Sequence, residues 1–386
     1  MKLLTSVLLF TLVLVPACDR SDSAESAGAA TPPPVTLRVG HVGHDHHLAL
    51  YVAALEGERL LRDYGIGLKE VKPREVYDLV SGDQPVARLM LFKVGGGSRM
   101  PAAMSRGEIE IGLGGVAAVA KFADAGQPFK IICPLQTDGD MLVMQPDSPV
   151  TDWASFVQAA KTGEKPLRIG YKAPVAVAKL VFERALQAED IGYGFDPSDP
   201  DVRVVLVNFG SEASPIPLME TGAIDGFVMN QPAVAVAIDK GLGKQVAELR
   251  DLPPTGKWLD HPCCCIAATS DALVEQHHAV KALLKVILLA TQLINNDQEL
   301  AIDCASRWTK YDKAVETASI PTITYGAEPT EQWLAGMNTW GQMVKEVDLF
   351  RDHYKDLPSE EFVADVCDLA LCREAIDELR EAGHLK

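Results

Sequence analysis

Apolar residues in this chain alternate between short continuous runs and longer segments in which they recur at helical spacing. The run Leu37–His41 is followed by a turn and then by helical spacing over Leu48–Tyr64, which ends at Gly65. The run Leu167–Tyr171 has nearly the same form, and helical spacing follows it over Pro174–Gln187. Each pair predicts a buried strand followed by a helix, so the chain repeats one strand–helix unit.

A second pair of segments, Arg106–Gly112 and Thr221–Phe227, repeats in the same order, with a helix end, a glycine and a short strand in each. Alternating strands and helices predict an α/β protein of two similar lobes, each a mixed sheet flanked by helices, with a ligand cleft between them. Ligands of such sheets bind beyond the carboxyl ends of strands. The contact residues predicted at these ends are Gly97, Ser98, Gly114 and Gly115 in the first lobe and Lys172, Asn230 and Gln231 in the second.

The first residues have the pattern of an export signal. The apolar run Leu3–Val15 is shorter than the roughly 20 residues that span a bilayer. The following Val15–Cys18 resembles the lipobox of bacterial lipoproteins, which predicts a signal peptide over residues 1–17 and lipidation of Cys18. Residues 18–35 are polar and end in prolines, which predicts a flexible tether. We therefore expect a lipoprotein on the periplasmic side of a membrane, inner or outer; an ordinary signal peptide ending near a cysteine is the alternative.

The composition restricts the partners of the chain. It has 386 residues and a formal net charge of −17, which argues against nucleic acid or an anionic membrane surface as the main partner, although a local site can still bind an anion. Eight cysteines are present, and lipidation of Cys18 leaves seven, so at least one thiol is predicted to be free or metal-bound. Pairing of Cys367 with Cys372 stays open. The apolar segment Ala279–Ile294 contains two lysines and is predicted to be a buried helix.

Several segments in a fixed order resemble one family. They are Leu37–Gly43, Leu55–Gly57, Ala102–Ile111, Gly126–Ile131, Gly222–Pro232 and His261–Ala268. From about Thr36 to Val344 the chain resembles the periplasmic substrate-binding proteins of ABC transporters in the family of nitrate, bicarbonate, taurine and alkanesulfonate binders. The eukaryotic enzyme that makes the thiamine pyrimidine precursor shares that fold. The resemblance implies the two-lobe, type II periplasmic binding protein fold.

The resemblance also implies lobe boundaries, partners and an activity. Residues 36–141 begin the first lobe, residues 142–260 form the second, and residues 261–386 complete the first with C-terminal helices. The implied protein is a monomer without enzymatic activity or cofactor. It captures a small polar or anionic solute by lobe closure and delivers it to an ABC permease and its ATPase. Two alternatives stay open: an enzyme like the pyrimidine synthase, using histidines and cysteine-bound iron, and the ligand-sensing module of a signalling system.

Four histidines fall within seven residues, in the segment Gly40–His47 at the mouth of the predicted cleft. Three interpretations compete. In the first, the cluster binds a polar or anionic ligand near a helix N-terminus, through His44, Asp45, His46 and His47. In the second, His44 and His46 with Asp45 hold a transition metal, since imidazole suits such ions. In the third, these side chains cap the helix or are exposed in a loop.

Cys263, Cys264 and Cys265 are consecutive. On a strand, alternation sends Cys263 and Cys265 to one face and Cys264 to the other. Because free cysteine behaves as a small apolar residue, we interpret the three as part of a buried sheet. A thiol that lines the cleft is one alternative, and metal binding by Cys263 and Cys265, alongside His44 and His46, is the other. The chain has no Gly-x-Ser-x-Gly, His-Glu-x-x-His or Walker motif, so no catalytic residue is predicted.

Overall fold

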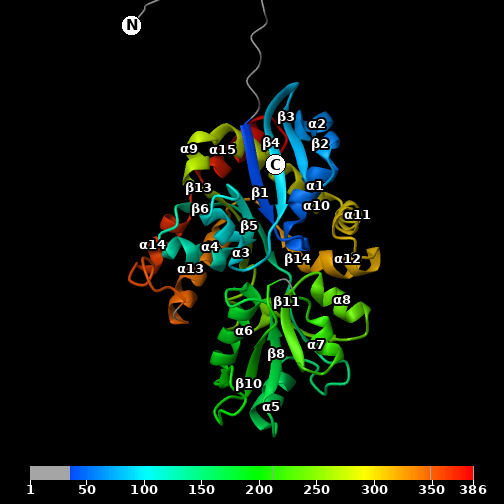
Figure 1. Ribbon diagram of the computed structural model, residues 1–386, viewed down its shortest axis with the longest axis vertical. Coiled ribbons are helices and arrows are strands. Elements are labelled where there is room, and N and C mark those ends of the chain that lie inside the picture. Colours follow the sequence, from blue (N-terminus) through cyan, green and yellow to red (C-terminus); the bar gives the residue numbers. More distant parts are fainter. Residues whose placement is uncertain (1–34, 212, 348, 386) are drawn as a thin grey trace, which may run out of the picture. The chain divides into compact units, whose positions relative to one another are not determined.

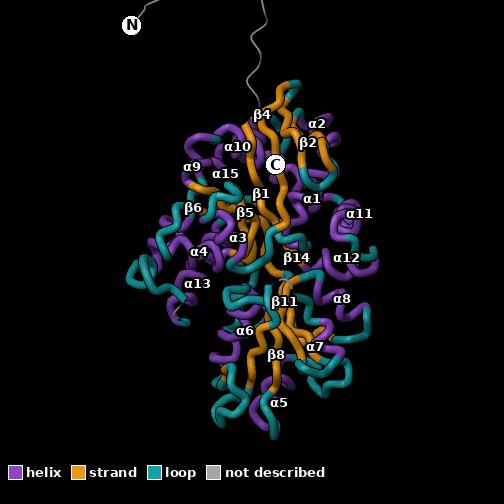
Figure 2. Tube along the Cα trace, in the orientation of Figure 1, coloured by secondary structure: helices purple, strands orange, loops and turns teal. Residues whose placement is uncertain are grey.

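The computed structural model describes residues 35–211, 213–347 and 349–385. The predicted signal peptide over residues 1–17, the lipidated Cys18 and nearly all of the tether lie outside these residues. From Pro34 onward the chain forms one unit with its own core, and this unit contains two sheets (Figures 1 and 2).

The first sheet mixes parallel and antiparallel neighbours. Its strands are β1 (Val35–His41), β2 (Ile66–Lys72), β3 (Val76–Ser81), β4 (Gln84–Lys93), β5 (Ile111–Gly115), β6 (Phe129–Asp138), β13 (Pro262–Thr269) and β14 (Ile323–Tyr325). Across the sheet they follow the order β14–β6–β13–β5–β1–β4–β3–β2. Strand β1 pairs in parallel with β4 and β5, so the carboxyl ends of these three strands meet at one edge.

The second sheet is smaller and also mixed. Its strands are β7 (Asp140–Met144), β8 (Leu167–Tyr171), β9 (Tyr193–Gly194), β10 (Val204–Asn208), β11 (Gly226–Asn230) and β12 (Lys244–Glu248), in the order β12–β7–β11–β8–β10–β9. Strand β8 pairs in parallel with β10 and β11, whereas β7 runs antiparallel to β11 and β12. The chain therefore passes from the first sheet to the second at Gly139 and returns between Glu248 and Pro262.

Helices cover both sheets. In the segment of the second sheet they are α5 (Trp153–Thr162), α6 (Val177–Ala188), α7 (Ile216–Glu220) and α8 (Ala233–Asp239), coloured green in Figure 1. The others are α1 (Leu48–Leu55), α2 (Gly57–Tyr64), α3 (Arg99–Ser105), α4 (Val116–Asp124), α9 (Ser270–Glu275), α10 (His277–Asn296), α11 (Gln298–Thr309), α12 (Lys313–Ser319), α13 (Glu331–Glu346), α14 (Ser359–Val366) and α15 (Ala370–Glu381). Short 3-10 turns lie at Asp45–His47, Leu249–Asp251 and Ile320–Thr322.

The helix expected over Ala279–Ile294 is α10. Among the described residues, α10 alone is long and apolar enough to cross a membrane, but 72% of its most apolar stretch is buried inside the protein. The prediction of a buried helix is therefore confirmed.

The strands expected after the tether and in the second half are confirmed as β1 and β8, but two helix predictions need correction. The expected helix Leu48–Tyr64 is divided into α1 and α2, because Gly57 lies against the backbone of β2 and the chain bends at Glu56. The helix expected from Pro174 begins only at Val177, so the proline precedes the helix instead of occupying its first turn.

A buried carboxylate at the end of α4 holds the loop between α13 and α14. Asp124 is 3% exposed and accepts hydrogen bonds from the backbone N–H groups of Arg351 (2.9 Å), Asp352 (3.3 Å) and Tyr354 (2.7 Å). We expect Asp124→Ala to lower the free energy of unfolding by about 2 kcal/mol, because these donors lose a charged acceptor. Asp124→Asn keeps one acceptor oxygen, so its loss in urea unfolding is expected to be smaller. Equal unfolding midpoints for Asp124→Ala and the wild type would contradict this role.

Candidate functional site

A cavity of about 390 Å³ opens where segments that follow strands of both sheets come together. The part of the chain that carries the first sheet contributes Val42, Gly43, His44, Lys93, Val94, Gly95, Gly96 and Tyr311, and the second sheet's part contributes Lys172, Ser211, Ser214, Asn230 and Gln231 among others. Two of the described lining residues are lysines and none is Asp or Glu, although the chain carries 53 acidic against 36 basic side chains. The local charge is therefore opposite to that of the whole molecule.

Lys172 follows β8 and donates a hydrogen bond from Nζ to Oδ1 of Asn230, the last residue of β11. The Asn230 amide donates in turn to the Gln231 carbonyl at 2.6 Å, and Gln231 Oε1 accepts from the Ala235 N–H at 3.0 Å. Burial lowers the pKa of Lys172, and the nearby Cys264, Asp140 and Cys263 oppose that shift. These contacts hold the ammonium group at the cavity wall without a salt bridge to a carboxylate among the described residues.

The histidines follow β1 in the turn that leads into α1. His46 and His47 are fully buried and His44 is half-buried. The Val42 N–H donates to His47 Nδ1 at 3.1 Å. His46 Nε2 lies 3.4 Å from the Gly139 carbonyl oxygen, and its Nδ1 lies 3.4 Å from Cys263 Sγ. Burial, followed by the charge of His47, lowers the pKa of His44 well below its usual value, and burial also lowers that of His47.

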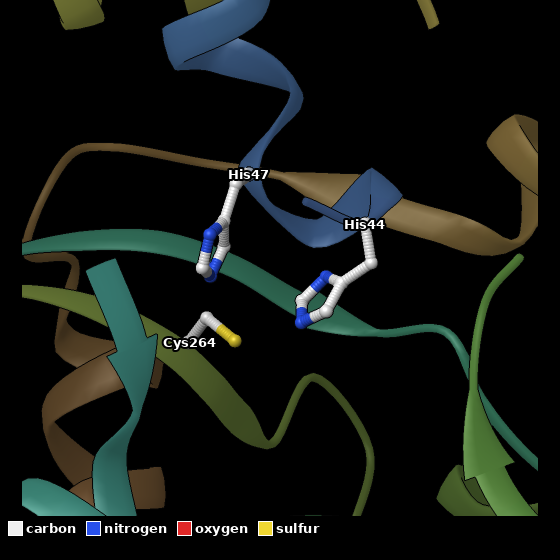
Figure 3. A group of neighbouring side chains, drawn as sticks. All are labelled: His44, His47 and Cys264. Carbon is white, nitrogen blue, oxygen red and sulfur yellow. The ribbon is translucent and has the colours of Figure 1, made fainter. Parts of the chain in front are cut away.

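The cysteines of β13 do not alternate as expected. The ligand atoms of His46, Cys263 and Cys264 lie within 4.8 Å of one another, and so do those of His44, His47 and Cys264. Figure 3 shows the rings of His44 and His47 turned toward the Cys264 sulfur. Cys265 instead points to the Gly114 carbonyl oxygen, 3.5 Å from its sulfur. The prediction that Cys264 faces away from Cys263 is wrong, because β13 shifts register against β6 on both sides of Cys264.

The thiols are free and buried at all seven cysteines of the described residues, and Cys367 is not bonded to Cys372. Hydrogen bonding to Cys263, and then to His46 and His47, lowers the pKa of the Cys264 thiol well below its usual value against the effect of burial. Burial raises the pKa of Cys263, whose sulfur lies 3.3 Å from Asp140 Oδ2. Of these two neighbouring thiols, Cys264 is therefore the one whose surroundings lower its pKa.

Asp45 is fully buried and belongs to neither group of ligand atoms. Its Oδ2 accepts a hydrogen bond from the Ser319 hydroxyl, and the Tyr325 hydroxyl donates to its backbone oxygen at 3.0 Å. Burial, and then the neighbouring Glu316, raises the pKa of the Asp45 carboxyl well above its usual value. These contacts place Asp45 at the packing of the turn against α12 and β14.

The crossing between the sheets carries a polar network that the sequence did not indicate. Asp138 and Asp140 flank Gly139, and both are almost fully buried. Arg250 Nη1 lies 2.8 Å from Asp138 Oδ2, and His261 lies 3.5 Å from Asp138 and 3.6 Å from Asp140. Burial opposes protonation of His261, but Asp140 and Asp138 outweigh it and raise the pKa of the imidazole. The chain turns between β6 and β7, with positive φ at Asp138 and Gly139.

The predicted contact residues have different surroundings. Four of the predicted contact residues line the 390 Å³ cavity, namely His44, Lys172, Asn230 and Gln231. A neighbouring cavity of about 40 Å³ is lined in part by His44, His46, Gly97, Gly115, Cys263 and Cys264. Neither cavity is lined by Asp45, His47, Ser98 or Gly114. Of the predicted metal ligands, His44, His46 and Cys263 lie close to a shared cysteine, which is Cys264 rather than Cys265.

Lys93 and Tyr311 are among the lining residues that the sequence did not predict, for different reasons. Lys93 is the last residue of β4, so the same strand-end rule that indicated Lys172 would have indicated it. Tyr311 lies between α11 and α12, far along the chain from the other lining residues, and no local pattern marks it.

His41 makes stability depend on pH. It is 5% exposed, its Nδ1 lies 3.2 Å from the Tyr51 hydroxyl, and burial, followed by His47 and Lys93, lowers its pKa to about 3. The unfolded chain binds this proton below pH ~6.5, so the stabilising effect is complete above that pH and is lost as pH falls. We expect the free energy of unfolding to fall by about 1 kcal/mol between pH 6 and pH 5 from this residue alone.

The check is urea unfolding at both pH values with a chelator present. His41→Asn is expected to be less stable overall but to lose about 1 kcal/mol less than the wild type between pH 6 and pH 5. The same substitution at the exposed His278 is the control and leaves the wild-type pH dependence. An unchanged pH dependence in His41→Asn would show that other groups account for the loss at low pH.

The sequence of this chain is similar to a known protein family and to an archaeal protein. A model of the NMT1-like family matches residues 30–308. An uncharacterized protein of Methanocaldococcus jannaschii is 31% identical over 144 residues, which cover 37% of this chain and 94% of that protein.

Three solved structures show the fold. The ligand-binding component of an ABC-type import system from Staphylococcus aureus, solved with zinc bound, has a TM-score of 0.67 at 17% identity and covers 88% of this chain and 99% of that one. The nitrate-binding protein NrtA of Synechocystis PCC 6803 has a TM-score of 0.65 at 16% identity over 92% and 91% of the two chains. The alkanesulfonate-binding protein SsuA of Xanthomonas axonopodis pv. citri, bound to MOPS, has a TM-score of 0.63 at 15% identity over 88% and 100%. These likenesses confirm the predicted type II periplasmic binding protein fold.

Proposed function

Because this chain belongs to the NMT1-like family, we propose that it is the solute-binding protein of an ABC importer and that it captures a small anionic solute between its lobes. The solute binds in the 390 Å³ cavity, contacts both lobes and stabilises the closed state. The closed protein then docks on the permease, whose ATPase drives uptake. No covalent chemistry is needed for this function.

The observation that carries the proposal is the charge of the cavity. Lys93 comes from the first lobe and Lys172 from the second, so an anion between them is attracted by both lobes at once. Hydrogen-bond donors for an anion are available from the hydroxyl groups of Ser214 and Tyr311. An anion in this cavity therefore favours closure, whereas a cation would be repelled.

The proposed location of the protein in the cell rests on its N-terminal sequence. Lipidation of Cys18 anchors a monomer to the periplasmic side of a membrane, and the tether keeps the lobes near the permease at a high local concentration. Incorporation of labelled palmitate by the wild type, and its loss in Cys18→Ala, is the expected result. A wild-type chain that is exported and cleaved but not labelled would show an ordinary signal peptide instead.

The function is tested by thermal shift and calorimetry on the chain from residue 19 onward. The panel contains nitrate, bicarbonate, taurine, an alkanesulfonate, MOPS and neutral pyrimidines. A ligand that binds the folded state must raise its stability by mass action. We expect at least one anion of the panel to raise the midpoint and to bind with one site per chain. Stabilisation by the neutral pyrimidines alone would contradict the anionic solute.

The cluster of histidines and cysteines is the observation that favours the second candidate function, an enzyme like the pyrimidine synthase. A pyrimidine synthase-like enzyme would contain iron as purified and would consume a pyridoxal-type substrate. Incubation of the iron-loaded protein with pyridoxal phosphate, followed by chromatography of the products, tests this alternative. We expect no pyrimidine product, and turnover would replace the transport proposal.

A further inference from the structure

The smaller cavity next to the solute cavity is lined by side chains that can bind a metal ion. Its volume is about 40 Å³, and His44, His46, Cys263 and Cys264 lie in its wall. The surrounding ligand atoms fall into two groups that share the Cys264 sulfur, and each group is within 4.8 Å throughout.

The hydrogen bonds of His47 show that it does not bind a metal at this place. The Val42 N–H points at His47 Nδ1, which must therefore be the unprotonated nitrogen. The proton of the neutral ring is then on Nε2, the atom that is buried, has no hydrogen-bond partner among the described residues and belongs to the ring facing Cys264 (Figure 3). His47 can donate a hydrogen bond to a thiolate at Cys264 but has no lone pair to offer an ion.

The hydrogen bonds of His46 have the opposite consequence. Its Nε2 faces the Gly139 carbonyl oxygen, which can only accept, so the proton of the neutral ring is on Nε2. Its Nδ1 then presents a lone pair toward Cys263 Sγ, 3.4 Å away. An imidazole that donates one N–H to a backbone carbonyl and points the other nitrogen at sulfur ligands has the arrangement of a metal-binding histidine.

We propose that His46 Nδ1 and the thiolates of Cys263 and Cys264, whose ligand atoms lie within 4.8 Å of one another, bind one divalent zinc-type ion. The ligand atom of His44 is grouped with Cys264 and His47 instead, so His44 turns toward the ion to become the fourth ligand. Two imidazoles and two thiolates are a tetrahedral zinc ligand set, and the two thiolates balance the charge of the ion. Sulfur ligands disfavour Mg²⁺ and Ca²⁺, which prefer oxygen. His47 acts from outside the ligand set, through a hydrogen bond from Nε2 to the Cys264 sulfur.

Two charged side chains near the site act in opposite directions. Lys172 also borders the small cavity and repels a cation, whereas the Asp140 carboxylate, 3.3 Å from Cys263 Sγ, attracts one. All four ligands belong to the turn after β1 and to β13, and both elements are part of the first lobe. Metal binding therefore needs neither lobe closure nor the anionic solute, and it stands independently of the proposed transport function.

The test uses zinc and cobalt chloride alone, without any solute, on the chain from residue 19 onward, which lacks the Cys18 thiol and contains the whole folded unit. Competition with a chromophoric chelator is expected to show one Zn²⁺ per chain. The cobalt form is expected to show tetrahedral d–d bands and sulfur-to-cobalt charge-transfer bands. Cys263→Ser and Cys264→Ser should each remove about half of the charge-transfer intensity. Cys265→Ser is the matched control from the same strand and should match the wild type.

Variants of His46 and His47 test which of these two buried histidines binds the ion. His47→Gln is expected to keep the charge-transfer intensity and to weaken zinc binding by about 10- to 100-fold, as loss of an outer hydrogen bond does. His46→Gln removes a ligand, so it should weaken binding by more than His47→Gln and change the d–d bands. The reverse order of effects would overturn the assignment of the ligands.

Two further measurements keep the result interpretable. Circular dichroism of each metal-free variant shows whether it folds, and only folded variants are compared. Lys172→Met should retain zinc binding, because it removes a repelling charge, whether or not it still binds an anion. Wild-type zinc affinity in both Cys263→Ser and Cys264→Ser would overturn the site and leave the transport proposal unaffected. A wild type that binds zinc but none of the anions would overturn the transport proposal and leave the metal site unaffected.

Discussion

Replacement of Lys172 by methionine is expected to weaken binding of the anion selected by the panel at least about 30-fold in Kd, which corresponds to about 2 kcal/mol. Methionine keeps most of the length and the apolar stem of lysine but removes the charge. Lys172 Nζ is held at the cavity wall by Asn230, so the ammonium group is already positioned before the solute arrives. The measurement is calorimetric titration of the wild type and the variant at the same ionic strength.

Two comparisons decide whether the loss comes from the site. Lys240→Met makes the same change of charge at an exposed position outside the cavity lining, and it should leave Kd unchanged. The affinity of the wild type should fall as salt is added, and that of Lys172→Met should depend less on salt. An affinity of Lys172→Met within twofold of the wild type would place the anion elsewhere.

Gly57→Ala is expected to lower the free energy of unfolding by about 3 kcal/mol. Gly57 begins α2, and a Cβ at this position would lie 1.9 Å from the backbone oxygen of Leu68 in β2. The contact is reciprocal, because a Cβ on Gly67 would lie 2.2 Å from the Gly57 oxygen. Alanine's better helix propensity opposes the loss by at most about 1 kcal/mol, so the steric effect decides the sign. Urea unfolding monitored by circular dichroism measures it.

The control for this prediction is another glycine of the same unit. A Cβ on Gly326 would meet nothing within 4 Å, and its φ lies outside the left-handed region, so Gly326→Ala should be within about 0.5 kcal/mol of the wild type. If Gly57→Ala were equally neutral, α2 and β2 would have to be free to separate without loss of stability.

The Leu55–Gly57 segment shows what the sequence can and cannot predict about local structure. Gly57 belongs to a segment that resembles the family, and no local pattern explains why a glycine is needed there. The structure supplies that reason, because the backbones of α2 and β2 touch at this residue. The same contact explains why the predicted helix Leu48–Tyr64 is broken in two. Helical periodicity is a local property, whereas the break is imposed by a strand that follows the helix.

The sequence by itself determined the repeated strand–helix units, the two-lobe α/β fold and the positions of Lys172, Asn230 and Gln231 at strand ends. These conclusions depend on periodicity and on the chain direction of parallel strands, and both can be read within a few residues. It also showed an unusual density of histidine near the cleft. It did not show which imidazole nitrogen carries a proton or which cysteine turns toward the histidines.

Only the tertiary structure decided those points. The tautomer of His46 is set by the Gly139 carbonyl, 93 residues away, and Cys263 reaches His46 from 217 residues further along the chain. The direction of Cys264 depends on register shifts between β13 and β6, which simple strand alternation does not contain. Hydrogen-bond partners and strand register between distant segments are set when the lobes fold. The sequence could therefore propose His44, His46 and Cys263 as metal ligands, but it named Cys265 where the structure has Cys264.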